Sequence, residues 1–572
     1  MRGIFLNWVT VFSRLNCKCR SNSHAFTTSM RGKSYYVTTP IFYVNSQPHL
    51  GHLYTATLAD VAGRWQRLKN GKEVVFATGT DEHGQKIQEA AAEEEMEPKS
   101  FCDKVSGRYK DLYELCNIDY TDFIRTTDTR HKEAVHAFWK ILEDKGYIYK
   151  GSYEGWYSTQ DENFVTELQT KISAGHRISI ESGHKVEWVK ENNYVFRLSA
   201  VIDEVKTWAR QNPSCVYPAK FHRVLLENLD AMTGDISISR ESSRVSWGIE
   251  TPSDSTQTVY VWLDALINYL TVAGFPDVNG ERFRTTWPAN CHIIGHDILK
   301  FHAIYWPAFL IAAGLDLPKQ IVVHSHWLMN RRKMSKSLGN VINPFNVANS
   351  VSGERLKYFL IKQGVLEHDC DFNHHLLLQS VNGDLCNSLG NCLHRAVAPK
   401  LNPDQIYTNF YKDCYPNLIS FSDKASGEKP SGLINLVQKL PDDVNKFCED
   451  FHFYKAAEAI MECVRESNLL IHRNKTWRLD LHNARDKKLN DTALHCVYET
   501  LRVCGILLQP FVPRIANDML DRLNVQHHER TFLHATKSFY GYGNSAEACP
   551  MTGRKLGKNR GVLIKKVSKI RF

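Results

Sequence analysis

The segment from residue 35 to about residue 90 alternates between strand and helix patterns, and this alternation restricts the fold most. Tyr35 to Val44 is rich in aromatic and β-branched residues, as a buried strand is, and a helical pattern runs from about Leu53 to Lys69. Glu73 to Thr78 predicts a second strand, after which another helical pattern begins. This order predicts a parallel sheet covered by helices, with ligands bound beyond the carboxyl ends of its strands.

The composition is that of a soluble globular protein of several domains. The chain has 572 residues, of which 43% are hydrophobic and 23% are charged. No run approaches the length of about 18 apolar residues that a membrane span needs. The longest candidate, Trp306 to Leu315, is interpreted as a buried helix. Fifteen cysteines are scattered without the spacing of a disulfide framework, which favours a reducing compartment.

Both ends of the chain are basic. Residues 1–33 hold six Lys or Arg residues and no acidic residue, a pattern typical of a presequence for import into mitochondria. The alternative is a disordered basic leader that carries no targeting signal. We therefore expect a protein of the mitochondrial matrix. The last 22 residues hold eight Lys or Arg residues and no acidic residue, which suits contact with a phosphate backbone as well as a solvated end.

The middle of the chain changes character twice. The pattern becomes short and irregular after about residue 146, and strand-like segments resume at Thr258 to Leu263, His292 to Gly295 and Ile321 to His324. From about Phe372 onwards, nearly every apolar pattern has the period of a helix. The predicted segments are a presequence (1–33), a first half (34–145) and a second half (255–371) of the sheet domain, an insertion between them (146–254), a helical bundle (372–540) and a basic tail (541–572).

Residues 48–52 read Pro-His-Leu-Gly-His, where the first predicted strand ends and a helix begins. The start of a helix offers amide groups and a partial positive charge, which favour a phosphate group. His49 and His52 can add hydrogen-bond donors to an α-phosphate, and Gly51 lets a purine ring lie against the backbone. Taken alone, the motif is weak evidence, because a buried, hydrogen-bonded histidine is the usual explanation of such a tetrad.

Residues 333–337 read Lys-Met-Ser-Lys-Ser and follow an apolar strand. A solvated basic loop is the usual explanation of such a run. Beside the ligand edge of the sheet, however, Lys333 and Lys336 can hold the β- and γ-phosphates more tightly in the transition state than in the ground state. The two motifs together predict activation of a carboxylate with ATP.

In these motifs the chain resembles the class I aminoacyl-tRNA synthetases, whose HIGH and KMSKS signatures match residues 49–52 and 333–337. Residues 36–45, 78–84, 260–266 and 295–302 are further similar to the methionyl-tRNA synthetase family, in its organellar and bacterial-like branch. The resemblance runs from about residue 35 to 540. It implies an α/β fold, in which a Rossmann-like parallel-sheet catalytic domain is split by an inserted connective domain and followed by an all-α anticodon-binding bundle.

The resemblance also implies the site residues. The matches to the family's methionine pocket are Ile41, Tyr43, Asp81, Trp262, Ala265, Tyr269, Ile298 and His302. An aromatic wall suits a thioether, and a tyrosine hydroxyl and a histidine N–H can donate weakly to its sulfur. Asp81 matches the residue that holds the α-amino group. The matches to the ATP contacts are His49, Gly51, His52, Gly295, Asp297, Lys333, Ser335 and Lys336.

Catalysis is implied for His49, His52, Lys333 and Lys336, and a ribose contact for Asp297. His296 departs from the family, since many relatives carry lysine there.

Three residues of the helical part match the family's anticodon contacts. Asn391 and Arg395 are four residues apart and should share one helix face, while Trp477 matches a residue that stacks on an anticodon base. The neighbours Thr476 and Leu470 replace a usual proline and a usual tyrosine.

No structural zinc is expected, and no other metal site. The family's zinc-binding cysteines would follow Tyr153 to Tyr157, but the chain continues there with Ser-Thr-Gln-Asp, and it contains no Cys-x-x-Cys pair.

The resemblance implies ATP-dependent activation of L-methionine to methionyl-adenylate and its transfer to tRNA(Met) for mitochondrial translation. Mg²⁺ would enter with ATP, and we expect a monomer that does not bind membranes. The sequence disfavours three alternatives. Another class I synthetase such as the cysteinyl enzyme would need thiolate zinc ligands, which the matching region lacks. The intact histidines and lysines argue against an RNA-binding protein that has lost catalysis, and a small-molecule nucleotidyltransferase has no need of the long helical region.

Overall fold

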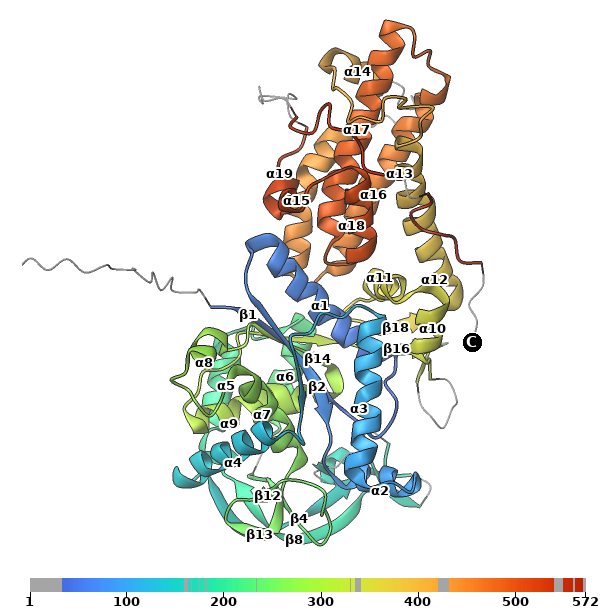
Figure 1. Ribbon diagram of the computed structural model, residues 1–572. Coiled ribbons are helices and arrows are strands. Elements are labelled where there is room, and N and C mark those ends of the chain that lie inside the picture. The colour runs from blue at the N-terminus through green and yellow to red at the C-terminus, as the bar shows by residue number, and fades with distance from the viewer. Residues whose placement is uncertain are drawn as a thin grey trace, which may run out of the picture. The chain divides into compact units, whose positions relative to one another are not determined.

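A computed structural model describes most of the chain (Figure 1). The described residues are 33–158, 163–165, 167–173, 175–180, 183–232, 234–329, 331–334, 341–419, 432–539, 549–558 and 561–568. They all fall within one compact unit, residues 33–572. The expected presequence lies outside the described residues, apart from Lys33.

Six parallel strands form the central sheet, in the order β3-β2-β1-β14-β15-β9. Their bounds are β1 (Tyr35–Tyr43), β2 (Val74–Asp81), β3 (Asp122–Arg125), β9 (Val216–Tyr217), β14 (Cys291–Gly295) and β15 (Ile321–His324). The strands predicted near residues 35, 73, 292 and 321 are confirmed, because strands buried on both faces appear in sequence as continuous apolar runs.

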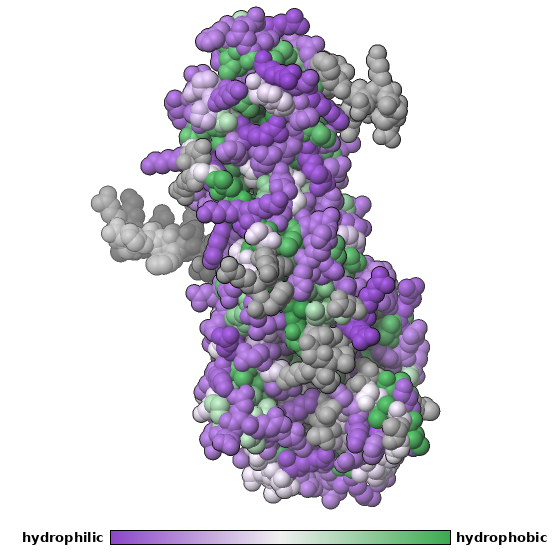
Figure 2. Space-filling model, turned by 90° about the vertical axis from the view of Figure 1, so that its right-hand side faces the viewer, coloured by the Kyte–Doolittle hydropathy of each residue, from purple (hydrophilic) through white to green (hydrophobic). Residues whose placement is uncertain are grey.

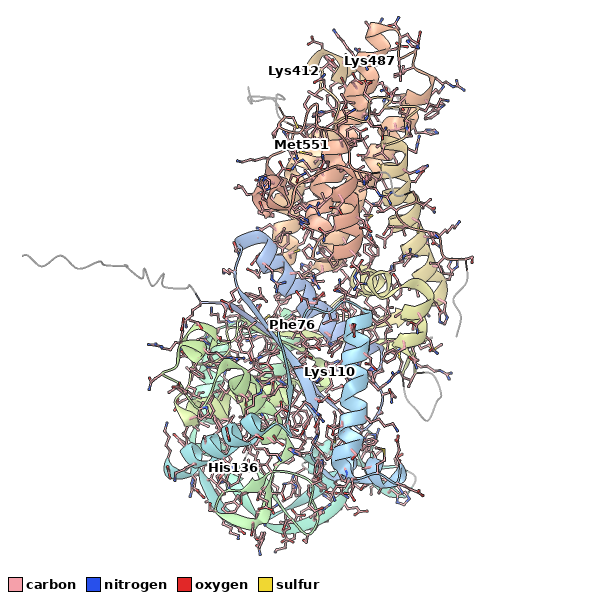
Figure 3. The ribbon with its side chains drawn as sticks, in the orientation of Figure 1. Phe76, Lys110, His136, Lys412, Lys487 and Met551 are labelled. Carbon is pink, nitrogen blue, oxygen red and sulfur yellow. The ribbon has the colours of Figure 1, made fainter. Side chains whose placement is uncertain are left out.

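The sheet separates two hydrophobic cores. Val37 and Ile293 face one core, which includes helix α1 (Leu50–Asn70) and helix α3 (Pro98–Leu115). Their neighbours Tyr36 and Ile294 face the other core, because successive side chains of a strand point to opposite faces. The helices of that second core are α4 (Thr129–Asp144), α7 (Val261–Ala273) and α9 (Trp306–Ala313). The side chain of Phe76 in β2 belongs to the first core (Figure 3).

The segment predicted as an insertion, residues 146–254, contributes strands to four different sheets. Its four-stranded antiparallel sheet has the order β10-β8-β4-β5, formed by β4 (Ile148–Ser158), β5 (Asn163–Val165), β8 (Glu187–Phe196) and β10 (Ile236–Ser237). Beside it lie η1 (Glu167–Gln169) and the hairpin of β6 (Thr170–Ser173) and β7 (His176–Ser179).

The chain then passes through η2 (Leu198–Ala200), α5 (Ile202–Gln211), β9 and α6 (Ala219–Asp230). Val216 of β9 pairs with Ile321, so part of this segment completes the central sheet. A strand of only two residues carries too short a pattern to be recognised from sequence.

The strand predicted over Thr258 to Leu263 is wrong in its second half. β13 (Asp254–Val259) pairs with β11 (Ser239–Glu241) and β12 (Glu250–Thr251), and α7 begins at Val261. Almost every residue of α7 is buried. A helix that is apolar on all sides cannot be distinguished from a buried strand by periodicity.

The remaining elements before residue 373 complete the sheet region. They are α2 (Gln85–Glu93), α8 (Glu281–Thr286), η3 (His296–Ile298), the π-helix η4 (Phe301–Tyr305), β16 (Trp327–Met329), β17 (Arg332–Lys333), α10 (Pro344–Val351), α11 (Gly353–Gln363) and β18 (Cys370–Phe372). The buried helix expected after Trp306 is confirmed as α9. No helix in the described part of the chain is long and apolar enough to cross a membrane.

The helical region follows, as predicted. Its elements are α12 (His374–Ser380), η6 (Val381–Gly390), α13 (Asn391–Ala396), η7 (Lys412–Cys414), α14 (Tyr415–Ile419), α15 (Leu433–Glu449), α16 (Phe453–Arg473), η8 (Thr476–Arg478), α17 (Ala484–Leu508), α18 (Pro513–Arg522), η9 (His527–Glu529) and α19 (Phe532–Thr536). The face shown in Figure 2 is mostly hydrophilic, with apolar residues in small separate groups.

The described part of the basic tail packs against the protein. Ile564 is buried, Asn382 exchanges two hydrogen bonds with the backbone of Val567, and Arg355 donates to the carbonyl of Lys565. The tail therefore contacts η6 and α11.

A buried ion pair joins α1 to α11. The ammonium of Lys357, which is fully buried, donates to the carboxylate of Asp60 and to the carbonyl of Asn117, 3.0 Å away. Asp60 also accepts from Arg64 at 2.9 Å. Removal of one partner leaves the other charge buried without full compensation.

We therefore expect Lys357→Met to lower the free energy of unfolding by about 3 kcal/mol. This value is at the lower end of the range for a broken buried ion pair, because Arg64 still compensates part of the Asp60 charge. Urea unfolding measures this. Lys99→Met is the matched control, since Lys99 forms a half-exposed pair with Asp103; its effect should stay below about 1 kcal/mol. Equal unfolding midpoints for the two variants would contradict the prediction.

Candidate active site

A cavity of about 380 Å³ opens at the carboxyl ends of the central strands. Every predicted methionine or ATP residue whose side chain the structure describes lines it. These residues are Ile41, Tyr43, His49, Gly51, His52, Asp81, Trp262, Ala265, Tyr269, Gly295, Asp297, Ile298 and His302. They come from β1, the start of α1, the end of β2, helix α7, and β14 with the two helical turns that follow it.

His49 and His52 lie at the start of α1 as neutral donors. The Nδ1 atom of His49 accepts from the amide of Gly51 at 3.1 Å, and Nδ1 of His52 accepts from the hydroxyl of Tyr109 at 3.0 Å. The ring proton of each histidine is therefore on Nε2. Burial lowers the pKa of His49 to about 4 and that of His52 well below its usual value. At neutral pH the two rings offer N–H groups rather than charges.

The absence of a side chain at Gly51 also leaves room for the ring of His49. A Cβ atom at this position would lie 3.0 Å from Cε1 of His49. Any side chain would therefore push against the ring that caps the helix.

The deep wall of the cavity is built from Tyr269 and His302. Nδ1 of His302 donates to the carbonyl of Ile298 at 3.0 Å, so its Nε2 accepts from the Tyr269 hydroxyl at 2.7 Å. Both polar hydrogens of this pair are thus used within the protein. In this form they are not directed at a thioether, which differs from the expectation that both donate to sulfur. Trp262 stacks on Phe301 with ring centres 3.6 Å apart.

Asp81 ends β2 and is 8% exposed. The segment after it is fixed by two buried groups. Glu82 accepts from Arg125 at 2.6 and 2.9 Å. His83 and His131 each lie 2.7 Å from the carboxylate of Asp264 in α7. Burial alone would raise the pKa of Asp264, but the two histidines lower it to about 2.

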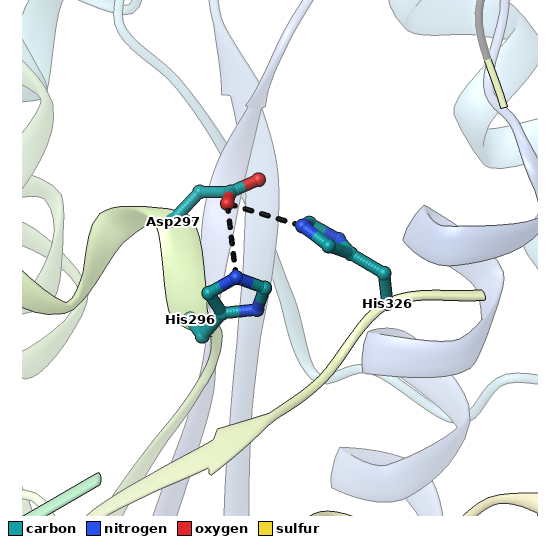
Figure 4. Close-up of side chains that lie close together, drawn as sticks. All are labelled: His296, Asp297 and His326. Atoms are coloured by element: carbon teal, nitrogen blue, oxygen red, sulfur yellow. Dashed lines mark hydrogen bonds and ion pairs between the residues drawn. The ribbon is translucent and has the colours of Figure 1, made fainter. Parts of the chain in front are cut away.

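Sequence reasoning missed His324 and His326, which also line the cavity. Nε2 of His324 lies 2.8 Å from the Thr55 hydroxyl, which ties β15 to α1. Nε2 of His326 lies 3.1 Å from Oδ1 of Asp297, and Nε2 of His296 lies 3.3 Å from the same oxygen (Figure 4). The signal was present in the sequence, because His324 is the last residue of a predicted strand of the sheet and His326 follows two residues later.

Of the lysine motif, the structure describes only the beginning. The backbone of Lys333 pairs with Leu328 in β16, two residues after His326. The side chain of Lys333, together with Ser335 and Lys336, lies outside the described residues. This pairing places the start of the motif beside β16, the strand that follows the cavity residue His326.

The predicted anticodon residues lie in the helical region. Asn391 and Arg395 belong to α13, and the Arg395 guanidinium lies 5.6 Å from the centre of the Trp477 ring. Trp477 is 37% exposed, whereas Thr476 and Leu470, the two departures from the family, are buried. These replacements therefore act on the interior and leave the indole accessible.

Metal-ligating side chains gather at one place. Within the described residues, His296, Asp297 and His326 are the group of three close enough to share an ion. The stretch that lacks the family's zinc-binding cysteines continues into residues 159–162, outside the described residues, so the expected absence of structural zinc stays a prediction. All thirteen described cysteines are free thiols.

Comparisons with known proteins agree with this architecture. A model of the family "tRNA synthetases class I (M)" matches residues 35–397, and the chain belongs to this family of class I tRNA synthetases. The mitochondrial methionine–tRNA ligase of Homo sapiens is 45% identical, and the match covers 94% of this chain and 91% of that protein. The enzyme of the same name from Takifugu rubripes is 48% identical, with 94% and 90% covered.

A solved structure, the Mycobacterium tuberculosis methionyl-tRNA synthetase in complex with methionyl-adenylate, has a TM-score of 0.84 at 33% identity. It matches 93% of this chain and 99% of that one. The chain is thus an aminoacyl-tRNA synthetase of the methionyl type.

The buried histidines predict how stability depends on pH. Burial lowers the pKa of His302 to about 4, from about 6.5 in an unfolded chain. The unfolded state therefore binds the proton more readily, and the stability contributed by the neutral ring is lost as the pH falls from about 6.5 towards 4. His49 and His324 have the same direction and the same value of about 4.

We expect the thermal unfolding midpoint to fall over this pH range, and His302→Gln to make the fall less steep. His375→Gln, at an exposed position, is the matched control. If wild type and His302→Gln lose stability in parallel, the His302 ring does not titrate on unfolding.

Proposed function

We propose that the cavity binds L-methionine and ATP side by side and joins them as methionyl-adenylate, which the enzyme then transfers to tRNA(Met). The observation that carries this proposal is that the described residues implied for both ligands line one cavity. The solved relative that contains methionyl-adenylate supports the same ligand pair.

Methionine occupies the part of the cavity beside Trp262 and Tyr269. Ile41, Ala265 and Ile298 add aliphatic surface, which suits an unbranched thioether side chain. Asp81 receives the α-ammonium group, because a carboxylate at the end of a strand can fix its orientation. With the hydrogens of Tyr269 and His302 turned to protein partners, the sulfur meets ring edges and the hydroxyl oxygen rather than strong donors.

ATP lies along the start of α1, towards Gly295 and Asp297. The carboxylate of methionine is already ionised, so its attack on the α-phosphate needs no protein base. His49 and His52 donate from Nε2 to the phosphate as its charge develops, and neutral donors do so without binding the ground-state triphosphate too tightly. Lys333 and Lys336 hold the leaving pyrophosphate. Mg²⁺ enters as part of the ATP complex.

The helical region binds the anticodon. Arg395 can donate to base edges, and the accessible face of Trp477 can stack on an unpaired base. Lys412 and Lys487 are exposed and lie together at one end of this region (Figure 3). Their positive charges favour contact with the phosphate groups of a bound tRNA. Relatives named mitochondrial support a mitochondrial location, and we place the enzyme in the matrix as a monomer.

Pyrophosphate exchange with each of the twenty amino acids tests this function, and methionine should support it best. Lys336→Ala should lower the single-turnover rate of adenylate formation at least roughly tenfold, the effect of losing one transition-state contact. Lys132→Ala, at an exposed position of α4, is the control. A normal single-turnover rate in Lys336→Ala would refute the role of this lysine, whereas no exchange with methionine in the wild type would refute the function.

Trp477→Ala should weaken tRNA charging but leave methionine-dependent pyrophosphate exchange intact, because its ring lies in the helical region and outside the cavity. Loss of one base stack costs about 1–3 kcal/mol. Leu533→Ala, at a more exposed apolar position, provides the comparison. Equal loss of charging and exchange would contradict the anticodon role of Trp477 and indicate a general loss of folded enzyme.

A further inference from the structure

Three side chains with metal-ligating atoms converge at one side of the cavity. The Nε2 atoms of His296 and His326 lie 3.3 and 3.1 Å from Oδ1 of Asp297 (Figure 4). One ligand atom from each of the three residues lies within 4.8 Å of the others. The side chains of His296 and His326 are 35% and 26% exposed, and that of Asp297 is 52% exposed, so an ion can reach them from solvent.

These spacings match the edges of a metal coordination shell. Zinc lies about 2.0–2.1 Å from imidazole nitrogen and carboxylate oxygen, so two ligands of a tetrahedral ion are roughly 3.3 Å apart. Both distances to Asp297 are already close to this value. We propose that His296, Asp297 and His326 bind a divalent transition-metal ion, with Zn²⁺ as the representative, at the edge of the cavity.

The surrounding structure holds the ligands in place. The His296 ring is stacked parallel to Phe221 of α6, with ring centres 6.0 Å apart. The amide of His326 donates to Asp369 at 3.0 Å. The parallel pairing of Gly295 with His324 fixes the two segments that carry the ligands. Binding therefore requires little rearrangement of the backbone.

The donor set selects the kind of ion. Two imidazoles and one carboxylate suit zinc, cobalt, nickel or copper, whereas Mg²⁺ and Ca²⁺ prefer shells of oxygen atoms. The proposed ion is thus distinct from the Mg²⁺ that enters with ATP. Three protein ligands leave at least one coordination position open.

The site affects the reaction by competition, a step that rests on the proposed function. Asp297 is the carboxylate implied for the ribose of ATP, and it also lines the cavity. A metal ion bound to its oxygen removes this acceptor and occupies space at the nucleotide end. Transition-metal ions should therefore inhibit adenylate formation competitively with ATP.

Direct binding of Zn²⁺ by the purified full chain, measured by calorimetry, tests the site without any activity assay. Co²⁺, followed by its visible absorption, provides a second measurement. His296→Gln and His326→Gln should each bind at least about tenfold more weakly, since loss of outer contacts alone costs 10–100-fold. Two variants keep the test available if one of them fails to fold, which thermal unfolding would show.

His136→Gln is the matched control. His136 is exposed on α4, and its Nε2 lies 3.0 Å from the carbonyl of Glu250, so this change also removes one imidazole but not a proposed ligand (Figure 3). Its affinity should equal that of the wild type. Equal affinity in all four proteins would overturn the proposal and show that the two histidines only orient Asp297.

Inhibition of pyrophosphate exchange by Zn²⁺ tests the competition, with each variant compared with its own metal-free rate. We expect the inhibition constant to rise with ATP concentration in the wild type and to increase at least about tenfold in His326→Gln. Binding without competition would overturn the inhibitory role. Failure of methionine to support exchange would refute the proposed function instead, and would leave the calorimetric result unaffected.

Discussion

The site depends on β1 lying in parallel register between β2 and β14. Parallel pairing sets Tyr43 beside Asp81, and the pairing of β14 with β15 sets Gly295 beside His324. Because all these strands end at the same edge, loops that are far apart in sequence form one cavity. A buried bond of 2.7 Å between Thr38 and His292 adds a side-chain link to this arrangement.

Much of this site could be predicted because its residues follow strands whose patterns are unmistakable. His49 follows the strand predicted to end at Val44 by five residues, Asp81 follows the one predicted to end at Thr78 by three, and the family resemblance then adds the remaining wall residues. The strand predicted over Thr258 to Leu263 extends wrongly into the start of the helix that carries Trp262, because burial on all sides removes the polar face from which a helix is recognised. β9 was missed because two residues have no detectable period.

Other features depend on geometry that a sequence does not contain. The Tyr269 hydroxyl donates to Nε2 of His302 because Nδ1 of the same ring faces the carbonyl of Ile298. Only the three-dimensional structure shows this orientation of the ring. The convergence of His326 on Asp297 likewise requires the register of β14 and β15. The neutral state of His49 follows from burial, so the proposed chemistry divides between uncharged donors on a fixed helix and the cationic side chains of Lys333 and Lys336.

The register also has a consequence for biosynthesis. Thr38 and His292 are neighbours in the sheet but lie 254 residues apart along the chain. At a synthesis rate of about 5–20 residues per second, the ribosome needs roughly 10–50 s to deliver the second strand after the first. During that interval one edge of β1 has no partner, and an open apolar strand edge is a template for aggregation. Shielding of the nascent chain by chaperones therefore matters more for this enzyme than for one whose neighbouring strands are made in succession.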